Sequence, residues 1–199
     1  MKSEKIIISD ENCNALILIW PSIYKNKSYW NEIIDLYCQI IKFLITNNIH
    51  VVLVDSLNMN SLENLVKRPK NILKRKFLTY LQYKKTHKYL HIIKYNCDDI
   101  WVRDFGPQVV FDEQLKSYSY YKYLYNGYGG KYEYKKDANF SDFFINKIIK
   151  SQKSLKFNNR KKVFTPFNNL IVEGGNIQTN GVGEIIINIR CLMKTNKIS

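Results

Sequence analysis

The sequence of 199 residues has few of the residues that build disulfide scaffolds or metal centres. Its cysteines and histidines are Cys13, Cys38, Cys97, Cys191, His50, His87 and His91. The cysteines are widely spaced and form no C-x-x-C pair, and the histidines lack the spacing of metal ligands. We therefore expect reduced, mostly buried thiols, without a disulfide framework or a zinc site.

Long hydrophobic runs are scarce as well. The apolar runs Ile6–Ile8 and Ala15–Trp20 fall well short of the roughly 20 residues that a membrane helix needs. No N-terminal targeting signal is recognisable. We expect a protein that does not span a membrane and that works in the cytoplasm.

Acidic residues are also few, 17 against 31 basic ones, which gives a formal net charge of +14. Lysines cluster at 67–76, 84–88 and 159–162. A basic stripe is typical of nucleic-acid binding. However, lysine, asparagine, isoleucine and tyrosine are all abundant together, which favours a drift in composition with the lysines on solvated faces. A basic nucleic-acid-binding domain is therefore the less favoured alternative.

The hydrophobic content of 45% fits one ordinary domain, and the apolar pattern alternates between strands and helices. This alternation predicts an α/β fold. The expected strands are 5–9, 14–20, 49–56, 88–96, 107–113, 116–123 and a hairpin of 176–179 and 184–188 turning at Asn180-Gly181. The expected helices are 28–48 with Ser28 as N-cap, one from 60 that Pro69 interrupts, and about 137–151.

The stretch "DDIWVRDFGPQVV" (98–110) follows a predicted strand and holds the first candidate site. Asp104 suits a planar cation, because a carboxylate accepts two parallel N–H bonds from a guanidinium. Trp101 would add an apolar wall and a face for cation–π contact. Gly106-Pro107 is expected to end the strand pairing. An Arg103–Asp104 pair satisfied by the neighbouring backbone explains these residues about equally well.

A second stretch, "VEGGNIQTNGVG" (172–183), places Glu173 after a predicted buried strand. Gly174-Gly175 would let the backbone approach a ligand or another strand closely. Asn176 supplies a neutral donor and acceptor. By itself this pattern is weak and also fits a bulge.

Together, the motifs resemble the agmatine deiminases and the bacterial-type peptidylarginine deiminases, which are guanidine hydrolases of the pentein fold. The resemblance rests on "ALILIWP" (15–21), "DDIWVRDFGPQVV", "YNGYGGKY" (125–132) and "VEGGNIQTNGVGEIIINIRCLM" (172–193). The third resembles the family's F-N-x-W-G-G-K-Y loop, with Tyr125 and Tyr128 in place of Phe and Trp. The four motifs run in order along nearly the whole chain.

The resemblance implies pentein modules, in which a cysteine thiolate attacks the guanidinium carbon and a histidine handles protons. It implies that Asp104 binds the guanidinium, that Glu173 supports the histidine, and that Trp101 lines the pocket. It implies a small guanidine substrate such as agmatine, in putrescine biosynthesis, and no metal or organic cofactor. Peptidyl-arginine remains an alternative substrate.

The sequence also departs from the family. An H-x-D motif after the E-G-G-N hairpin and a C-terminal cysteine nucleophile have no counterpart here, since all three histidines precede Asp104. We therefore expect residues 1–199 to be the N-terminal part of one catalytic domain, forming an incomplete propeller. The chain would then be inactive alone and depend on a separately encoded C-terminal half, or be a non-catalytic remnant.

Overall fold

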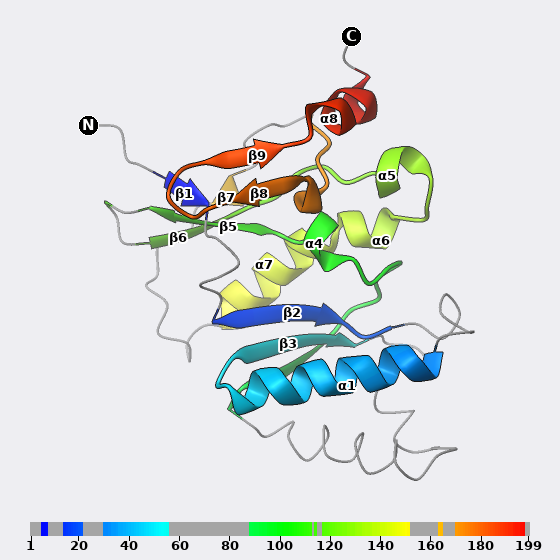
Figure 1. Cartoon of the computed structure of the whole chain (residues 1–199), viewed down its shortest axis with the longest axis vertical. Coiled ribbons are helices and arrows are strands. Elements are labelled where there is room, and N and C mark those ends of the chain that lie inside the picture. Colours follow the sequence, from blue (N-terminus) through cyan, green and yellow to red (C-terminus); the bar gives the residue numbers. More distant parts are fainter. Residues whose placement is uncertain are drawn as a thin grey trace. The chain divides into compact units, whose positions relative to one another are not determined.

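The computed structural model describes residues 5–7, 14–21, 30–55, 88–112, 114, 117–151, 163–164 and 170–197 (Figure 1). These residues form two compact units, Cys13–Val102 and a second unit of Met1–Asn12 with Arg103–Ser199. Both units mix helices and strands, so the α/β class is confirmed. The helix expected from residue 60 and the N-cap Ser28 lie outside the described residues.

The unit of Cys13–Val102 is built on a parallel sheet of β2 (Ala15–Ile19), β3 (His50–Asp55) and β4 (Leu90–Lys94), in that order. Helix α1 (Trp30–Thr46) connects β2 to β3 and runs along the sheet (Figure 1). The strands are rich in β-branched residues, which fit a pleated and buried surface. All four elements confirm the sequence expectations to within a few residues at each end.

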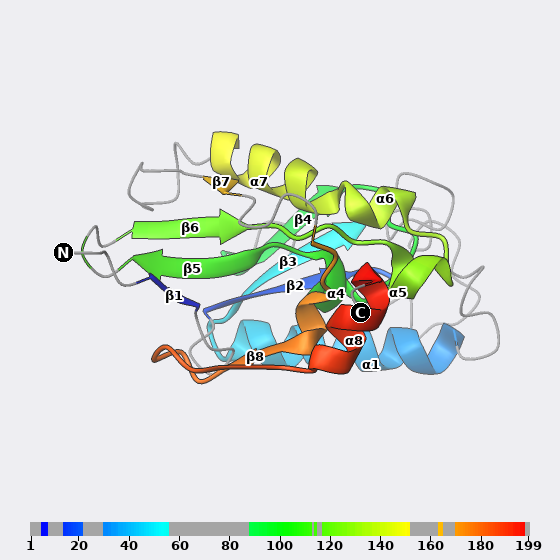
Figure 2. The same ribbon diagram turned by 90° about the horizontal axis from the view of Figure 1, so that it is seen from above.

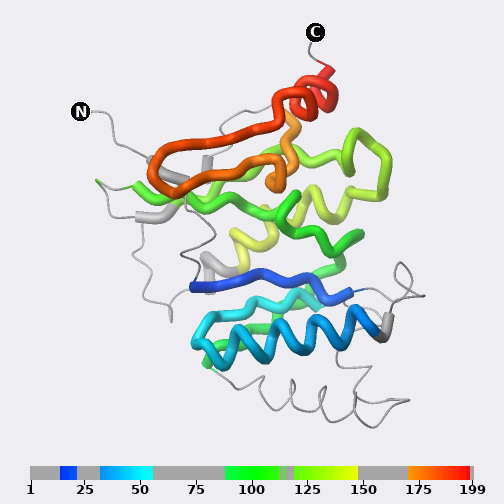
Figure 3. The backbone as a smooth tube through the Cα atoms, viewed as in Figure 1, coloured from blue at the N-terminus to red at the C-terminus, as the bar shows by residue number. Residues whose placement is uncertain are grey.

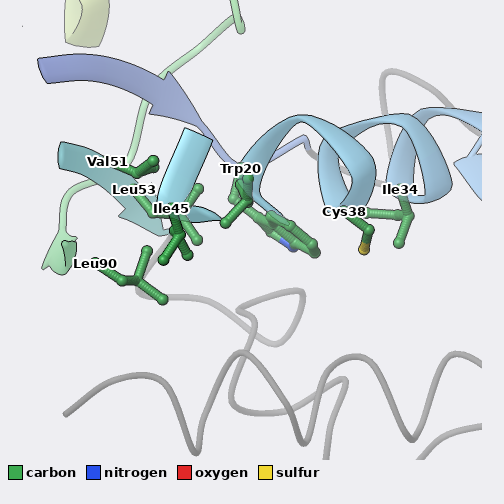
Figure 4. Packing of buried hydrophobic residues seen from close by; sticks show 8 residues of the cluster. Trp20, Ile34, Cys38, Ile45, Val51, Leu53 and Leu90 are labelled. Atoms are coloured by element: carbon green, nitrogen blue, oxygen red, sulfur yellow. The ribbon is translucent and has the colours of Figure 1, made fainter. Parts of the chain in front are cut away.

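The core of this unit forms where one face of α1 packs on the sheet (Figure 4). Ile34, Cys38, Ile41 and Ile45 recur every three or four residues, which places them on one side of the helix. Trp20 closes the cluster at the end of β2, where its ring meets the Tyr37 ring edge-on at 6.1 Å between centroids. The sheet side of the cluster consists of Val51, Leu53 and Leu90.

Two side-chain pairs link the ends of β3 and β4. At the carboxyl ends, Lys94 Nζ donates to the buried carboxylate of Asp55. At the amino ends, His50 Nδ1 and His91 Nε2 lie 2.9 Å apart, so the two rings share a hydrogen bond. Both pairs therefore tie neighbouring strands of the same sheet.

The second unit contains a four-stranded sheet in the order β1-β5-β6-β7. Its strands are β1 (Lys5–Ile7), β5 (Gln108–Asp112), β6 (Ser117–Tyr121) and β7 (Val163–Phe164). A separate antiparallel hairpin consists of β8 (Ile177–Thr179) and β9 (Ile185–Ile187) (Figure 2). The helices are α4 (Val102–Phe105), α5 (Gly127–Gly130), α6 (Lys135–Ala138), α7 (Phe140–Ser151), a 3-10 turn η3 (Gly174–Asn176) and α8 (Ile189–Asn196).

Two local expectations in this unit were wrong. Gly106-Pro107 does not end a strand but precedes β5, because the missing N–H of proline is tolerated where a strand begins. The single helix expected at 137–151 is two helices that break at Asn139, whose side chain donates to the carbonyl of Lys135. The expected hairpin of 176–179 and 184–188 is confirmed, since β8 pairs antiparallel with β9 and Asn180–Glu184 connects them.

The hairpin and the helix after it expose an unusual amount of apolar surface. Ile185, Ile186 and Ile187 are 48%, 75% and 41% exposed, so side chains on both faces of β9 reach solvent. Ile189 and Val182 are exposed as well. The orange-to-red trace of Figure 3 shows this hairpin leading into α8. Because a two-stranded sheet is marginal by itself, β9 is suited to be covered by further structure.

The sheets of both units are open and small, and the incomplete propeller remains a prediction. None of the helices in the described ranges is long and apolar enough to cross a membrane.

Candidate functional site

Three of the sequence motifs meet at the carboxylate of Asp104, which lies in α4. The backbone N–H of Gly175 donates to Asp104 Oδ1 at 3.1 Å. The hydroxyl of Tyr128 donates to Asp104 Oδ2. Gly175 belongs to the E-G-G-N segment, 71 residues after Asp104 in the sequence. Tyr128 belongs to the loop 125–132 and lies 24 residues after Asp104. Figures 1 and 2 show α4 beside the turn that precedes β8.

The glycines of the E-G-G-N segment make this approach possible. A Cβ atom on Gly174 would lie 2.3 Å from the backbone oxygen of Arg103, and one on Gly175 would lie 2.3 Å from Asp104 Oδ1. Neither distance leaves room for a side chain. The guanidinium of Arg103 ties the same two segments together by donating to the Ile177 carbonyl at 3.0 Å. The close backbone approach expected from Gly174-Gly175 is therefore present.

A cluster of aromatic rings, Phe105, Tyr125 and Phe140, packs beneath α4 and stabilises it. The Phe105 ring packs against the rings of Tyr125 and Phe140, with centroids 5.6 and 5.7 Å apart. In addition, Ser141 Oγ donates to the Phe105 carbonyl at 2.8 Å. Phe105 and Phe140 are buried, whereas the neighbouring Asp104 is only half-buried. The aromatic cluster thus holds the turn while the carboxylate keeps access to solvent.

The Tyr128 phenol is electrostatically coupled to Asp104. Burial raises the pKa of Tyr128 well above its usual range, and the hydrogen bond to the Asp104 carboxylate raises it further. The phenol therefore stays protonated, and it remains a hydrogen-bond donor at any physiological pH. The site thus presents an acceptor carboxylate that is held by two donors of the protein itself.

Glu173 lies at the entrance to η3, directly before the glycines that contact α4. Its side chain is half-buried and has no hydrogen-bond or ion-pair partner among the residues that the structure describes. Its backbone carbonyl accepts from the Asn176 N–H at 2.9 Å. The Asn176 side chain bonds to the backbone of Asn188 through both its oxygen and its nitrogen, which closes the base of the hairpin. Asn176 thus has a structural contact, whereas the Glu173 carboxylate has no partner in the part of the chain that the structure describes.

Trp101 is 57% exposed and belongs to the other compact unit, one residue before α4 begins. Its role as a pocket wall therefore stays a prediction. Within the second unit, the structure brings Asp104 and the Glu173 segment together.

Within the described ranges, no three His, Cys, Asp or Glu side chains lie together as metal ligands do. Cys38, Cys97 and Cys191 form no disulfide. Sequence analysis missed one contact of the site, the Tyr128 hydroxyl on Asp104. The replacement of the loop's usual Trp by a hydroxyl-bearing Tyr was the signal that could have revealed it.

The sequence matches the Porphyromonas-type peptidyl-arginine deiminase family over residues 9–198. Among solved structures, a Campylobacter jejuni agmatine deiminase variant with substrate bound superposes with a TM-score of 0.67 at 20% identity, covering 97% of this chain and 48% of its own. The agmatine deiminase of Enterococcus faecalis superposes with a TM-score of 0.65 at 14% identity, covering 95% and 45%. No curated protein sequence gives a significant match.

The match over nearly the whole chain shows that this protein belongs to the Porphyromonas-type peptidyl-arginine deiminase family. Its described fold is the mixed α/β fold of agmatine deiminases. The family inferred from the four sequence motifs is therefore confirmed. The chain spans about half the length of the solved structures that it matches.

Proposed function

We propose that this chain contributes the guanidinium-binding half of an agmatine deiminase-like hydrolase. The reaction converts agmatine and water to N-carbamoylputrescine and ammonia, in putrescine biosynthesis. The observation that carries the proposal is the convergence of three separate motifs on the Asp104 carboxylate. An aspartate with a purely structural role could be satisfied by local backbone donors, whereas the donors to Asp104 come from distant parts of the sequence.

Asp104 is the proposed anchor of the substrate guanidinium. Two donors already hold its oxygens, but each carboxylate oxygen has two lone pairs, so acceptor capacity remains for the two parallel N–H groups of a guanidinium. Its half-buried setting limits competition by water without the full cost of desolvating a charge. Trp101 is proposed to stack on the planar cation.

Glu173 is proposed to orient a catalytic histidine rather than to act as the base. Support for this role comes from the Glu173 carboxylate, which has no partner among the described side chains and precedes the Gly175–Asp104 contact in the sequence. A histidine that donates to such a carboxylate is held in one tautomer and orientation. All three histidines of residues 1–199 lie before Asp104 in the sequence, so we propose that the histidine and the nucleophilic cysteine come from further polypeptide.

That polypeptide is proposed to pack on the exposed hairpin of β8 and β9. Since the matched solved structures are about twice as long, their remaining length is sufficient to close a propeller of which this chain is one part. The exposed isoleucines of β9 offer apolar surface for that contact, and no described strand other than β8 pairs with β9. Whether the further polypeptide is the same chain or a second one does not change the contact proposed.

Agmatine is the proposed substrate, because the matched solved structures include agmatine deiminases, one with its substrate bound. No cofactor is proposed, since guanidine hydrolysis needs a thiolate, a proton carrier and water. The cytoplasm is the proposed location. Peptidyl-arginine stays the alternative substrate, because the family that the chain belongs to bears that name.

The decisive test is Asp104→Asn in the assembled protein, with ammonia release from agmatine as the assay. The substitution keeps the shape but removes the charge, so it should lower the rate by about 30-fold or more, as expected for loss of a charged contact of about 2–5 kcal/mol. Asp142→Asn is the matched control, because Asp142 pairs with Lys122 and is 46% exposed. Turnover of the Asp104 variant within tenfold of the parent would refute the assignment.

A non-catalytic remnant gives a different result. In that case, the parent protein with its complementary polypeptide releases no ammonia from agmatine or from peptidyl-arginine. Turnover of peptidyl-arginine alone would keep the guanidinium site and change the substrate.

A further inference from the structure

The turn that carries Tyr128 has an uncommon backbone. Residues 127–130 all have positive φ, of 64°, 60°, 79° and 82°. Tyr128 is the one residue of these four that is not a glycine, and a bulky side chain is disfavoured in this left-handed region. The chain therefore accepts local strain in order to place a tyrosine at this position.

Several contacts of the side chains hold the strained turn. Asn126 Oδ1 accepts from the Gly129 N–H at 2.8 Å, so the side chain caps the turn. The Tyr128 ring meets the rings of Tyr125 and Tyr132 edge-on, with centroids 5.8 and 5.9 Å apart. These contacts set the direction of the ring, and the ring in turn aims its hydroxyl at Asp104 Oδ2.

We propose that Tyr128 is a positioning residue, whose hydroxyl fixes the Asp104 carboxylate for a planar cation. This proposal rests on the guanidine-binding role proposed for Asp104. The hydroxyl acts through Asp104 and need not touch the substrate. The Gly175 N–H holds Oδ1 and the Tyr128 hydroxyl holds Oδ2, so the carboxylate is fixed at both oxygens.

A carboxylate held at one oxygen alone can still turn about its Cβ–Cγ bond, and binding must then restrict that rotation. Holding the second oxygen removes this cost before the ligand arrives, which is preorganisation. The family's loop has a Trp at this position, so the hydroxyl donor is a feature of this chain. The hydroxyl group of Tyr128 thus distinguishes this loop from the family's F-N-x-W-G-G-K-Y motif.

The first experiment tests the contact without any guanidine. Tetranitromethane attacks the phenolate form of tyrosine, so a phenol that donates to a carboxylate reacts slowly. At about pH 8, below the pKa of free tyrosine, peptide mass spectrometry should show Tyr128 nitrated at least about tenfold more slowly than the exposed Tyr132. Asp104→Asn should accelerate nitration of Tyr128 and leave Tyr132 unchanged. An unchanged rate at Tyr128 would overturn the proposal.

The second experiment measures agmatine binding by calorimetry in the assembled protein. Tyr128→Phe keeps the ring contacts and removes only the hydroxyl, so it should weaken binding about tenfold, the scale of one hydrogen bond to a charged group. Tyr132→Phe makes the same deletion in the same loop and should bind as the parent does. Equal affinity of Tyr128→Phe and the parent, with equal thermal midpoints, would overturn the proposal.

The two experiments separate the two proposals. If the parent binds no agmatine, the guanidine function fails, while the nitration rates still decide whether the Tyr128 hydroxyl holds Asp104. If the parent binds agmatine and nitration of Tyr128 is insensitive to Asp104→Asn, the guanidine function stands and the positioning role falls.

Discussion

Two adjacent glycines offer a sharp test of how the site is assembled, because their neighbours differ in kind. A Cβ at Gly174 would meet the backbone oxygen of Arg103, and a Cβ at Gly175 would meet the side-chain oxygen of Asp104, both at 2.3 Å. Backbone cannot move without its strand or helix, whereas a carboxylate can rotate away. Gly174→Ala should therefore disturb stability, and Gly175→Ala should disturb ligand binding.

The magnitudes follow from these contacts. Overpacking of two apposed backbones costs about 1–3 kcal/mol. If the segments separate, the Gly175–Asp104 and Arg103–Ile177 hydrogen bonds are lost as well, at about 1 kcal/mol each. Gly174→Ala should thus lower the free energy of unfolding by about 3–5 kcal/mol. Gly175→Ala should lower it by about 1 kcal/mol, since only the carboxylate gives way, but should weaken agmatine binding more than about tenfold.

Urea unfolding followed by tryptophan fluorescence measures the first quantity, and calorimetry with agmatine measures the second. Gly129→Ala serves as control, because no heavy atom of the described residues, apart from its own local backbone, lies within 4 Å of its Cβ position, so its φ of 79° introduces strain alone. That strain costs about 1–2 kcal/mol. If Gly174→Ala is no more destabilising than Gly129→Ala, the close packing of the two motifs does not contribute to stability as argued.

Three further predictions concern other parts of the chain. Lys94→Met removes the ammonium partner of the buried Asp55 carboxylate and should cost about 2 kcal/mol in urea unfolding, moderated because the Lys94 side chain is 37% exposed. Lys122→Met should cost less than about 1 kcal/mol, because the side chain of its partner Asp142 is 46% exposed. Burial and the charge of His50 lower the pKa of His91 below its unfolded value of about 6.5, so the unfolded state binds more protons. The thermal midpoint should therefore be maximal above about pH 6.5 and fall as the pH decreases, and His91→Gln should flatten that slope. Residues 1–199 expressed alone should release no ammonia from agmatine and should associate or aggregate, an effect that Ile186→Lys should reduce; a cooperative, monomeric melt by size exclusion and calorimetry would contradict this.

Much of the fold could be predicted from local patterns. The parallel strands β3 and β4 are β-branched runs, and α1 has a helical apolar period, so neighbouring residues determine them. The break at Asn139 could not be predicted this way, because it depends on whether a side-chain amide bonds to the preceding turn. The length of the hairpin turn depends similarly on Asn180, whose side chain accepts from two backbone N–H groups, of Val182 and Glu184.

The candidate residues come from the sequence motifs and stay a prediction, whereas the geometry around them does not follow from the sequence. The motifs singled out Asp104 and Glu173, and the glycines indicated a close approach of backbone. That the approach is to α4 itself follows only from the tertiary structure, since no local rule pairs residues about seventy positions apart. The Tyr128 hydroxyl contact depends on ring direction within a left-handed turn, which periodicity does not encode.

Two turns of the second unit begin with an Asn-Gly pair, Asn126-Gly127 and Asn180-Gly181, and this has a consequence for chemical ageing. Asn-Gly is the dipeptide most prone to deamidation, because the glycine amide attacks the asparagine side chain easily. Here the Asn126 oxygen is held by Gly129 N–H, and the Gly181 N–H is held by Thr179 Oγ1. These hydrogen bonds of the folded turns should therefore slow deamidation at both Asn-Gly pairs. Any loosening of the loop at Asn126 would start the irreversible loss of the turn that carries Tyr128.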